Sequence, residues 1–295
     1  MLDGTDVTYS YDGTFDGFLC CVFEVYNKKE FPRAIYSPLD NQTELFPPKE
    51  IETDMPKAER VRRSIPKIHK NALNFCYKVF LTNLEEKELY LLKFLQMGYR
   101  LGSKVMYMLA DETVNKLNTA VKFLGHEAHL YKGFIRFSVF DNALAAEIEP
   151  KNIVLPLLVR HFCERFPEEN FMIYDENHGA ALIHSGRRTA VIPVADLEIP
   201  KCEEDKFYRD LWKSYYRHIA IASRYNPKCR MSHMPKRFWS DMPEVMEELE
   251  SDFTQKLSLG TAEEIKRSLE EEKKARKAVA EEKKPLAAAL LGKKP

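Results

Sequence analysis

The chain has 295 residues, 44% of them hydrophobic, and its 45 basic side chains are balanced by 45 acidic ones. This composition excludes a wholly disordered protein and provides for one large or two modest folded domains. The longest apolar runs, residues 17–25 and 153–159, are much shorter than the roughly 20 residues that cross a bilayer. The N-terminus has no basic segment followed by an apolar core, so we expect a cytoplasmic protein with no membrane partner and no secretory signal.

The first half of the chain is predicted to be mainly helical. A short strand at residues 7–11 precedes GFLCCVFEVYNKK, whose length and spacing indicate a buried helix. Loops around a short strand are expected at residues 37–56, and helices at residues 57–110 with breaks at Pro66 and at 98–102. A further helix is predicted over residues 111–131, with Asp111 as its cap.

The middle of the chain changes to strand patterns. GFIRFSVF and ALAAEIEP resemble a β-hairpin, and a helix over residues 155–166 separates them from FMIYD, AALIH and TAVIPV. The short connections between the last three segments favour antiparallel pairing. We therefore predict an α+β fold with a mostly antiparallel sheet of about five or six strands, packed by several helices.

Residues 203–223 return to a helical pattern, and prolines divide the segment that follows into short turns. We expect a single α+β domain over residues 1–253 and a charged tail, helical or disordered, over residues 254–295. The tail has pairs of opposite charge spaced four residues apart but too few apolar residues to bury a stripe.

The six cysteines form no pattern typical of a disulfide framework, a zinc site or an iron–sulfur cluster. His126, Glu127 and His129 could supply two metal ligands, but no second cluster accompanies them. The sequence also lacks a phosphate-binding glycine loop and a GxSxG nucleophile elbow. We therefore expect no metal and no cofactor bound by this chain alone.

Two basic regions lie within this neutral chain. Residues 206–239 have nine Lys or Arg, one acidic residue and eight aromatic residues, and residues 57–78 have seven Lys or Arg and one acidic residue. Two such regions suggest a side of the protein that faces a polyanion.

On a helical wheel, Phe207, Leu211, Tyr215, His218 and Ala222 share one arc that we expect to be core, with Trp212 beside it. Lysines and arginines occupy the opposite side, at a pitch that could meet successive phosphates, although an ordinary solvated face is the alternative. In the loop that follows, Trp239 could stack on a base or could anchor a turn in the core. The candidate nucleic-acid-binding residues are Arg209, Lys213, Tyr216, Arg217, Arg224, Asn226, Lys228, Arg230, Lys236, Arg237 and Trp239.

A candidate catalytic site combines His161, Arg165 and Asp175. His161 and Arg165 are four residues apart in a predicted helix, and Asp175 ends a predicted strand, across a turn from His178. Such a group could transfer a proton or hold a phosphate, and it could equally be a buried ion pair or a cap network.

Four segments together resemble a known family: YDGTFDGFLCCVFEVY, HEAHLYKGFIRF, HFCERFP with MIYDENHG, and LWKSYYRHIAIASRYNPKCRMSHMPKRFWSDMPE. The resemblance is to the domain of unknown function DUF4130, and it runs from about Tyr9 to Glu244. It implies a role in DNA metabolism or DNA repair, either fused to a uracil-DNA glycosylase-like domain or beside a radical SAM protein. The recurrent polar residues of the family would fall on Glu127, His129, Arg136, His161, Arg165, Asp175, Arg224, Asn226, Pro235, Lys236, Arg237 and Trp239.

The leading hypothesis is a nucleic-acid-binding accessory domain that acts on DNA, single- or double-stranded, with a catalytic partner such as a radical SAM protein. A second hypothesis is an enzyme that processes nucleic acid with His161, Arg165 and Asp175. A third is a protein-interaction module whose basic surfaces bind an acidic partner.

Overall fold

The computed structural model describes residues 6–38, 47–140, 143–186, 188–194, 197 and 203–245. These residues fold into two compact units. The first contains residues 6–128 and 150–157, and the second contains residues 129–149 and 158–245. The predicted charged tail, residues 254–295, lies outside the described residues. Each unit is taken by itself below.

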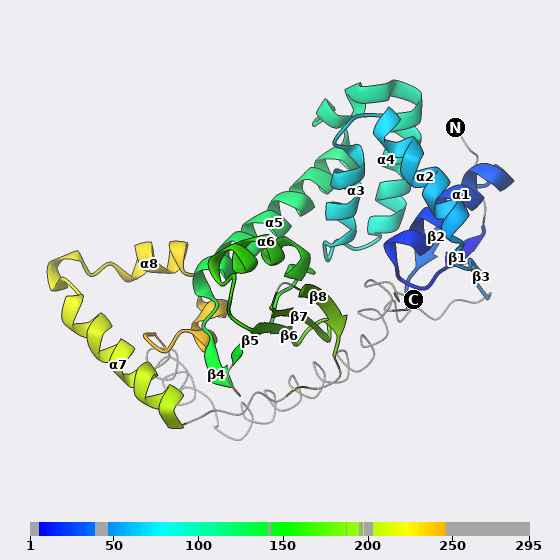
Figure 1. The fold of residues 1–295 in the computed structure, drawn as a ribbon. Coiled ribbons are helices and arrows are strands. Elements are labelled where there is room, and N and C mark those ends of the chain that lie inside the picture. The colour runs from blue at the N-terminus through cyan, green and yellow to red at the C-terminus, as the bar shows by residue number, and fades with distance from the viewer. Residues whose placement is uncertain are drawn as a thin grey trace, which may run out of the picture. The chain divides into compact units, whose positions relative to one another are not determined.

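The first unit contains a three-stranded parallel sheet (Figure 1). Its central strand β1 (Thr8–Ser10) pairs with β2 (Ala34–Tyr36) and with β3 (Lys49–Glu50), so that Tyr9 lies opposite Ile35 on one side and Lys49 on the other. Parallel neighbours need a crossover connection, and α1 (Phe15–Lys28) provides the one between β1 and β2. The strands expected at residues 7–11 and 37–56 are thus present, but their parallel pairing was not predicted.

Helix α1 begins and ends at residues whose chemistry fits those positions. The Thr14 hydroxyl accepts a hydrogen bond from the backbone N–H of Gly17 at 2.8 Å, and Lys29 takes a left-handed conformation with φ of 58° at the other end. Gly17 is required, because a Cβ there would lie 2.2 Å from the Asp12 Oδ1. The fully buried Phe18 and Leu19 then place the apolar face of α1 in the core.

Residues 55–107 fold into short helices: α2 (Met55–Ser64), the 3₁₀ turn η1 (Ile65–Lys67), α3 (Ala72–Phe80), α4 (Lys87–Leu101) and the 3₁₀ segment η2 (Gly102–Tyr107). The predicted breaks are confirmed, since η1 contains Pro66 and α4 ends at Leu101, just before Gly102, which has a φ of 64°. A further break between Phe80 and Lys87 was not predicted. The cap is confirmed too: the Asp111 Oδ1 accepts from the Val114 N–H at 3.1 Å at the start of α5 (Glu112–Phe134).

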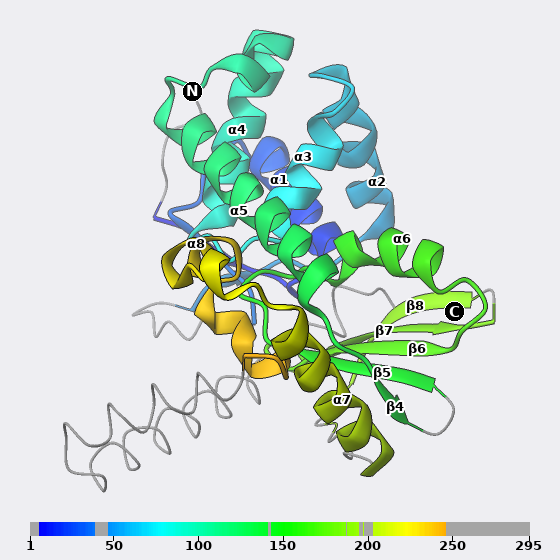
Figure 2. The ribbon, with the colours of Figure 1, turned by 90° about the vertical axis from the view of Figure 1, so that its left-hand side faces the viewer.

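The second unit contains a five-stranded sheet in chain order: β4 (Ser138–Phe140), β5 (Ala143–Ile148), β6 (Phe171–Asp175), β7 (Ala180–Ser185) and β8 (Arg188–Pro193). Figure 2 shows these strands side by side in that order. The pairs β4–β5, β6–β7 and β7–β8 are antiparallel. The pair β5–β6 is parallel, because α6 (Leu155–Arg165) connects the two strands.

An aromatic cluster fixes α6 on this sheet. Phe162 of α6 and Phe166, the residue after α6, lie 5.5 and 5.4 Å from the ring of Phe137, and Phe166 lies 6.2 Å from Phe171 at the start of β6 (ring centroids). The remaining elements are α7 (Glu203–Ile219), η3 (Ala222–Arg224), α8 (Pro227–His233) and η4 (Lys236–Asp241). The predicted α+β class is confirmed. Among the described helices, none combines the length and apolarity that a bilayer crossing would need.

Candidate functional site

Helix α7 exposes the face that we expected to be core. Phe207, Leu211 and Tyr215 are 65%, 55% and 54% exposed, and Trp212 is 42% exposed. His218 is exposed as well. The prediction of a core face is therefore wrong for these residues. Amphipathic spacing identifies which residues share a face, but burial requires a partner surface, and the described residues do not provide one for α7.

This exposed face contains aromatic and aliphatic side chains together. The Trp212 and Tyr215 rings lie 5.6 Å apart with an interplanar angle of 32°, so two flat surfaces are presented next to one another. Exposed large apolar side chains of α7 and of the residues just after it include Phe207, Tyr208, Leu211, Trp212, Tyr215, Ile219, Ile221 and Tyr225. Large apolar groups gathered on a surface are typical of a binding site.

The opposite side of α7 contains the predicted cations. Arg217 is exposed, while Arg209 and Lys213 are half-buried. The Arg209 guanidinium donates to the Ser138 hydroxyl at 2.9 Å, and the Lys213 Nζ lies 3.7 Å from a carboxylate oxygen of Asp210. Arg209 thus contacts β4, Lys213 lies beside Asp210, and Arg217 is exposed. Tyr216, the predicted bordering aromatic residue, is half-buried.

The segment after α7 is more ordered than the predicted loop. The Asn226 side chain caps α8 by accepting from the Cys229 N–H at 3.0 Å, so this residue has a structural role. Arg224 and Lys228 are exposed. The Arg230 guanidinium lies 5.8 Å from the Tyr225 ring and 5.1 Å from the Trp239 ring.

Trp239 is a core residue. Its side chain is only 2% exposed, its indole N–H donates to the Met234 carbonyl at 2.9 Å, and Lys236 lies 5.5 Å from its ring. The neighbouring Phe238, with Arg237 4.5 Å from its ring, packs 4.9 Å from Tyr131 of α5. Of the two roles considered for Trp239, burial therefore supports the anchor and argues against a base-stacking group.

The second basic region, in the first unit, is partly neutralised by carboxylates. Arg62 pairs with Asp16, Arg63 lies 2.7 Å from Glu59, and Lys57 lies 3.3 Å from Glu24. Surface pairs of this kind reduce the positive potential that a polyanion would meet.

The three candidate catalytic residues do not form one group. Arg165 ends α6 with its guanidinium 5.5 Å from the Phe166 ring, close to the start of β6, whereas Asp175 is at the far end of that strand. Asp175 is fully buried and binds His178 instead: Oδ1 accepts the backbone N–H at 3.1 Å, and Oδ2 lies 2.7 Å from Nδ1. This arrangement is the cap network considered as the alternative.

His161 lies apart from that pair. Burial lowers its pKa, and the nearby positive charges of Lys132 and Arg165 lower it further, against a smaller effect of Glu164. Its Nε2 is buried and has no hydrogen-bond partner among the described residues. The ring is therefore neutral near pH 7, and no carboxylate in the described part of the chain orients it as one would orient a general base.

A second polar cluster, which was not predicted from the sequence, includes one residue of α6 and two of the sheet. The Cys163 Sγ lies 3.6 Å from the His184 Nδ1 and 3.4 Å from the Thr189 Oγ1, and the last two atoms are 2.7 Å apart. These residues come from α6, β7 and β8: strand register pairs His184 with Thr189, and the position of α6 adds Cys163. Within the described residues, no group of three His, Cys, Asp or Glu side chains could hold a metal ion.

Two of the polar residues singled out by the resemblance have clear structural partners. Glu127 is buried and accepts from the backbone N–H groups of Lys151 and Asn152 at 3.1 and 3.0 Å. Arg136 donates to a carboxylate oxygen of Glu244 at 2.8 Å. His129 is exposed.

These features define an α+β protein with an exposed helix that is aromatic on one side and basic on the other. The chain belongs to the family of the domain of unknown function DUF4130, whose profile matches residues 85–244. The resemblance expected for residues 9–84 lies outside this matched span. No curated protein and no solved structure matches the chain.

Proposed function

We propose that this protein binds single-stranded nucleic acid through α7 and the turn that follows it, as an accessory protein in DNA repair or DNA metabolism. The observation that carries the proposal is the exposure of aromatic and basic side chains on the same helix, with Trp212 at 42% and Tyr215 at 54%. Exposed rings on one side of α7, with Lys213 and Arg217 on the other, supply the two kinds of group that bind single strands, stacking surfaces for bases and cations for phosphates.

The exposed rings of Trp212 and Tyr215 favour a single strand over a duplex as the ligand. In a duplex the base faces are already stacked and the phosphates lie outside, so Trp212 and Tyr215 would gain little from contact. In a single strand each unstacked base offers a face, and stacking contributes about 1–3 kcal/mol per base. Lysine and arginine contacts with phosphates add affinity that decreases as salt increases.

In this proposal a partner protein catalyses the reaction on the bound nucleic acid. Asp175 is paired with His178 and is fully buried, while His161 is oriented by no carboxylate among the described residues. This separation does not support an acid–base site built from His161, Arg165 and Asp175. A radical SAM protein is the partner that the family resemblance suggests, and presentation of DNA to it is part of the proposal.

The test measures binding of the full chain to a fluorescent single strand of about 20 nucleotides and to the matching duplex. Anisotropy titrations at low and moderate salt should give tighter binding to the single strand and a steep loss with salt. Lys213→Glu with Arg217→Glu should weaken binding at least about tenfold. The matched control reverses the charge of two exposed lysines outside α7, Lys104→Glu with Lys122→Glu, and should bind as the unaltered chain does.

Equal affinity at both salt concentrations, or full affinity in the folded Lys213→Glu, Arg217→Glu variant, would contradict the proposal. Circular dichroism establishes that each variant is folded before its affinity is compared.

A second candidate function, binding to an acidic protein partner, is favoured by the aliphatic residues on the same face. Leu211 and Ile219 are each 55% exposed and offer no ring for stacking. The Leu211→Ser variant separates the two functions. It should leave strand affinity unchanged if α7 binds nucleic acid, and it should weaken partner binding if α7 docks a protein.

A further inference from the structure

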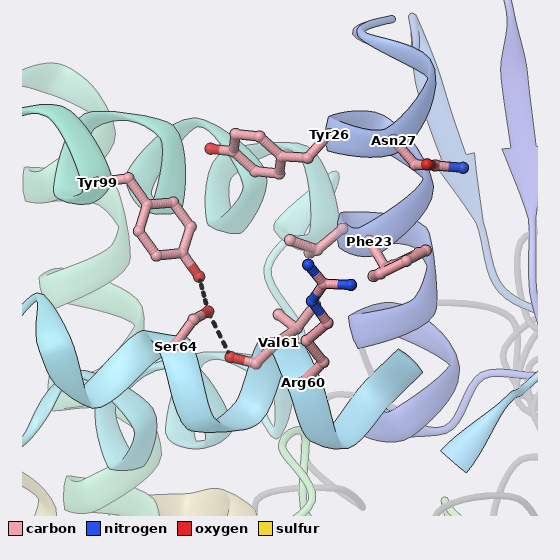
Figure 3. Close-up of a pocket in the computed structure, with 8 residues that line it drawn as sticks. Phe23, Tyr26, Asn27, Arg60, Val61, Ser64 and Tyr99 are labelled. Atoms are coloured by element: carbon pink, nitrogen blue, oxygen red, sulfur yellow. Dashed lines mark hydrogen bonds between the residues drawn. The ribbon is translucent and has the colours of Figure 1, made fainter. Parts of the chain in front are cut away.

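A pocket of about 500 Å³ opens between α1, α2 and α4 of the first unit (Figure 3). This volume falls in the range of small-molecule sites, about 300–1,000 Å³. Helix α1 contributes Phe23, Tyr26 and Asn27, α2 contributes Arg60 and Ser64, and α4 contributes Tyr99. The pocket uses none of the residues proposed above for strand binding.

Flat rings form one side of this pocket. Tyr26 and Tyr99 meet edge to face with their centroids 5.6 Å apart and an interplanar angle of 86°. Tyr26 and Tyr99 are each 39% exposed, so a ligand can reach them. Burial raises the pKa of Tyr26 to about 12 and raises the pKa of Tyr99 above its usual range, so both phenols stay neutral near pH 7.

A short hydrogen-bond chain fixes the position of the Tyr99 ring. Ser64 Oγ lies 2.6 Å from the Val61 carbonyl and 2.5 Å from the Tyr99 hydroxyl oxygen. The single Ser64 hydroxyl proton is donated to the Val61 carbonyl, so Tyr99 must donate to Ser64. Figure 3 shows this chain along one wall of the pocket. The ring is therefore held in place before any ligand arrives.

Arg60 is the charged residue that lines the pocket. Its guanidinium lies 5.8 Å from the centroid of Phe23, and Figure 3 shows it beside that ring. Its neighbours Arg62 and Arg63 are paired with Asp16 and Glu59. Arg60 has no ion pair with any described residue, so its positive charge is available to a ligand.

A second hollow, of about 440 Å³, adjoins the first along α2. Both are lined by Arg60 and Ser64, which are four residues apart and therefore lie on one face of the helix. The second hollow, which neither tyrosine lines, adds Arg63 and Lys67, together with Glu59, the carboxylate that pairs with Arg63. Because Glu59 offsets Arg63, the second hollow adds the positive charge of Lys67 to that of Arg60.

We propose that this pocket binds a nucleoside 5′-monophosphate, either free or as the phosphorylated end of a strand. The base lies against the rings of Tyr26 and Tyr99, and the phosphate lies at Arg60 with Lys67 beyond it. A neutral ring alone would leave Arg60 without a counter-charge, and a bare anion would leave the aromatic wall unused. A ligand that combines a flat ring with a phosphate satisfies both.

Isothermal titration of the full chain with AMP, adenosine and inorganic phosphate tests the pocket. AMP should bind, and adenosine and phosphate should each bind at least about tenfold more weakly, since each lacks one of the two contacts. Arg60→Gln should weaken AMP binding about tenfold or more. Arg100→Gln changes an exposed arginine of α4 outside both hollows and should bind AMP as the unaltered chain does.

A second variant probes the ring contact without altering charge. Tyr26→Leu should weaken AMP binding while leaving the weak binding of phosphate unchanged. Comparison of short oligonucleotides with and without a 5′-phosphate distinguishes the two sources of the ligand. If the strand end is the ligand, the phosphorylated oligonucleotide binds more tightly and Arg60→Gln removes the difference.

The proposal is overturned if AMP does not bind, if AMP binds no more tightly than phosphate, or if folded Arg60→Gln binds AMP normally. These results are distinguishable from failure of the α7 proposal. AMP binding should be unaffected by Lys213→Glu with Arg217→Glu, which changes only residues of α7.

Discussion

Arg136 and Glu244 form an ion pair across 108 residues of sequence, with the Arg136 Nη2 donating to the Glu244 Oε1 at 2.8 Å. The Glu244 side chain is 4% exposed and the Arg136 side chain 30% exposed. Arg136 also donates to the Gly133 carbonyl at 2.9 Å, at the end of α5. The pair therefore joins the segment that enters β4 to the end of the family-matched region.

Arg136→Met should destabilise the protein by about 1–3 kcal/mol, because the Glu244 carboxylate would remain buried without its partner. Changing both residues, Arg136→Met with Glu244→Met, should cost less than the sum of the single changes. Urea unfolding of the four proteins measures the coupling free energy. Strictly additive effects would show that the contact contributes nothing to stability.

The two tryptophans of the chain should behave in opposite ways. Trp239→Ala removes a buried ring and should cost about 3–5 kcal/mol of unfolding free energy. Trp212→Ala removes an exposed ring and should change stability by no more than about 0.5 kcal/mol. Thermal or urea unfolding measures both. Comparable losses in the two variants would mean that Trp212 is covered in solution.

The same pair of residues provides an optical signal for strand binding. In a Trp239→Phe variant, the remaining emission comes from Trp212, the only other tryptophan of the chain. Titration with a single strand should quench this emission if a base stacks on the ring. The Trp212→Phe variant is the matched control. Its remaining indole, that of Trp239, is buried, so its emission should be quenched little. Emission that stays constant while anisotropy reports binding would place the strand elsewhere.

Replacing each of two helical glycines by alanine should change the free energy of unfolding in opposite directions. At Gly98 of α4 a Cβ would lie 2.7 Å from Ile68 Cδ1 and 2.9 Å from its Cγ2, so Gly98→Ala should destabilise by about 1–3 kcal/mol. At Gly125 of α5 a Cβ would meet no atom within 4 Å, so Gly125→Ala should stabilise by about 0.5–1 kcal/mol. Unfolding midpoints of the two variants should therefore move in opposite directions.

His161 should make stability depend on pH. Its pKa in the fold is lowered, first by burial and then by Lys132 and Arg165. The unfolded chain therefore binds a proton more readily at this site, and stability falls as pH decreases below about 6.5 and is retained above it. His161→Leu should reduce this dependence, as measured by urea unfolding between about pH 5.5 and 7.5. An identical pH profile in the variant would assign the dependence to other groups.

The sequence predicted well those features that depend on local chemistry. Asp111 caps α5 as its position suggested, and Pro66 and Gly102 interrupt the helices where their backbone preferences require. The strand segments before and after α6 are present because alternation and turn residues are local signals as well.

Features that depend on distant contacts were not predicted. The apolar residues of α7 have helical spacing, yet Phe207 is 65% exposed. Periodicity shows which residues share a face, but it does not show whether another surface covers that face. Asp175 was grouped with His161 by proximity in sequence, whereas the tight turn after β6 pairs it with His178. The pocket beside Arg60 uses three helices, and no spacing rule connects residues 26, 60 and 99.

The parallel pairing of β5 with β6 has a consequence for how the second unit forms. Strands β6 to β8 are joined by tight turns, so their hairpins close small loops and can form within microseconds. β5 joins β6 only after the chain through α6 has folded back, which raises contact order and loop-closure entropy. We therefore expect the β6–β8 meander to act as a nucleus and the docking of β5 to limit the folding rate.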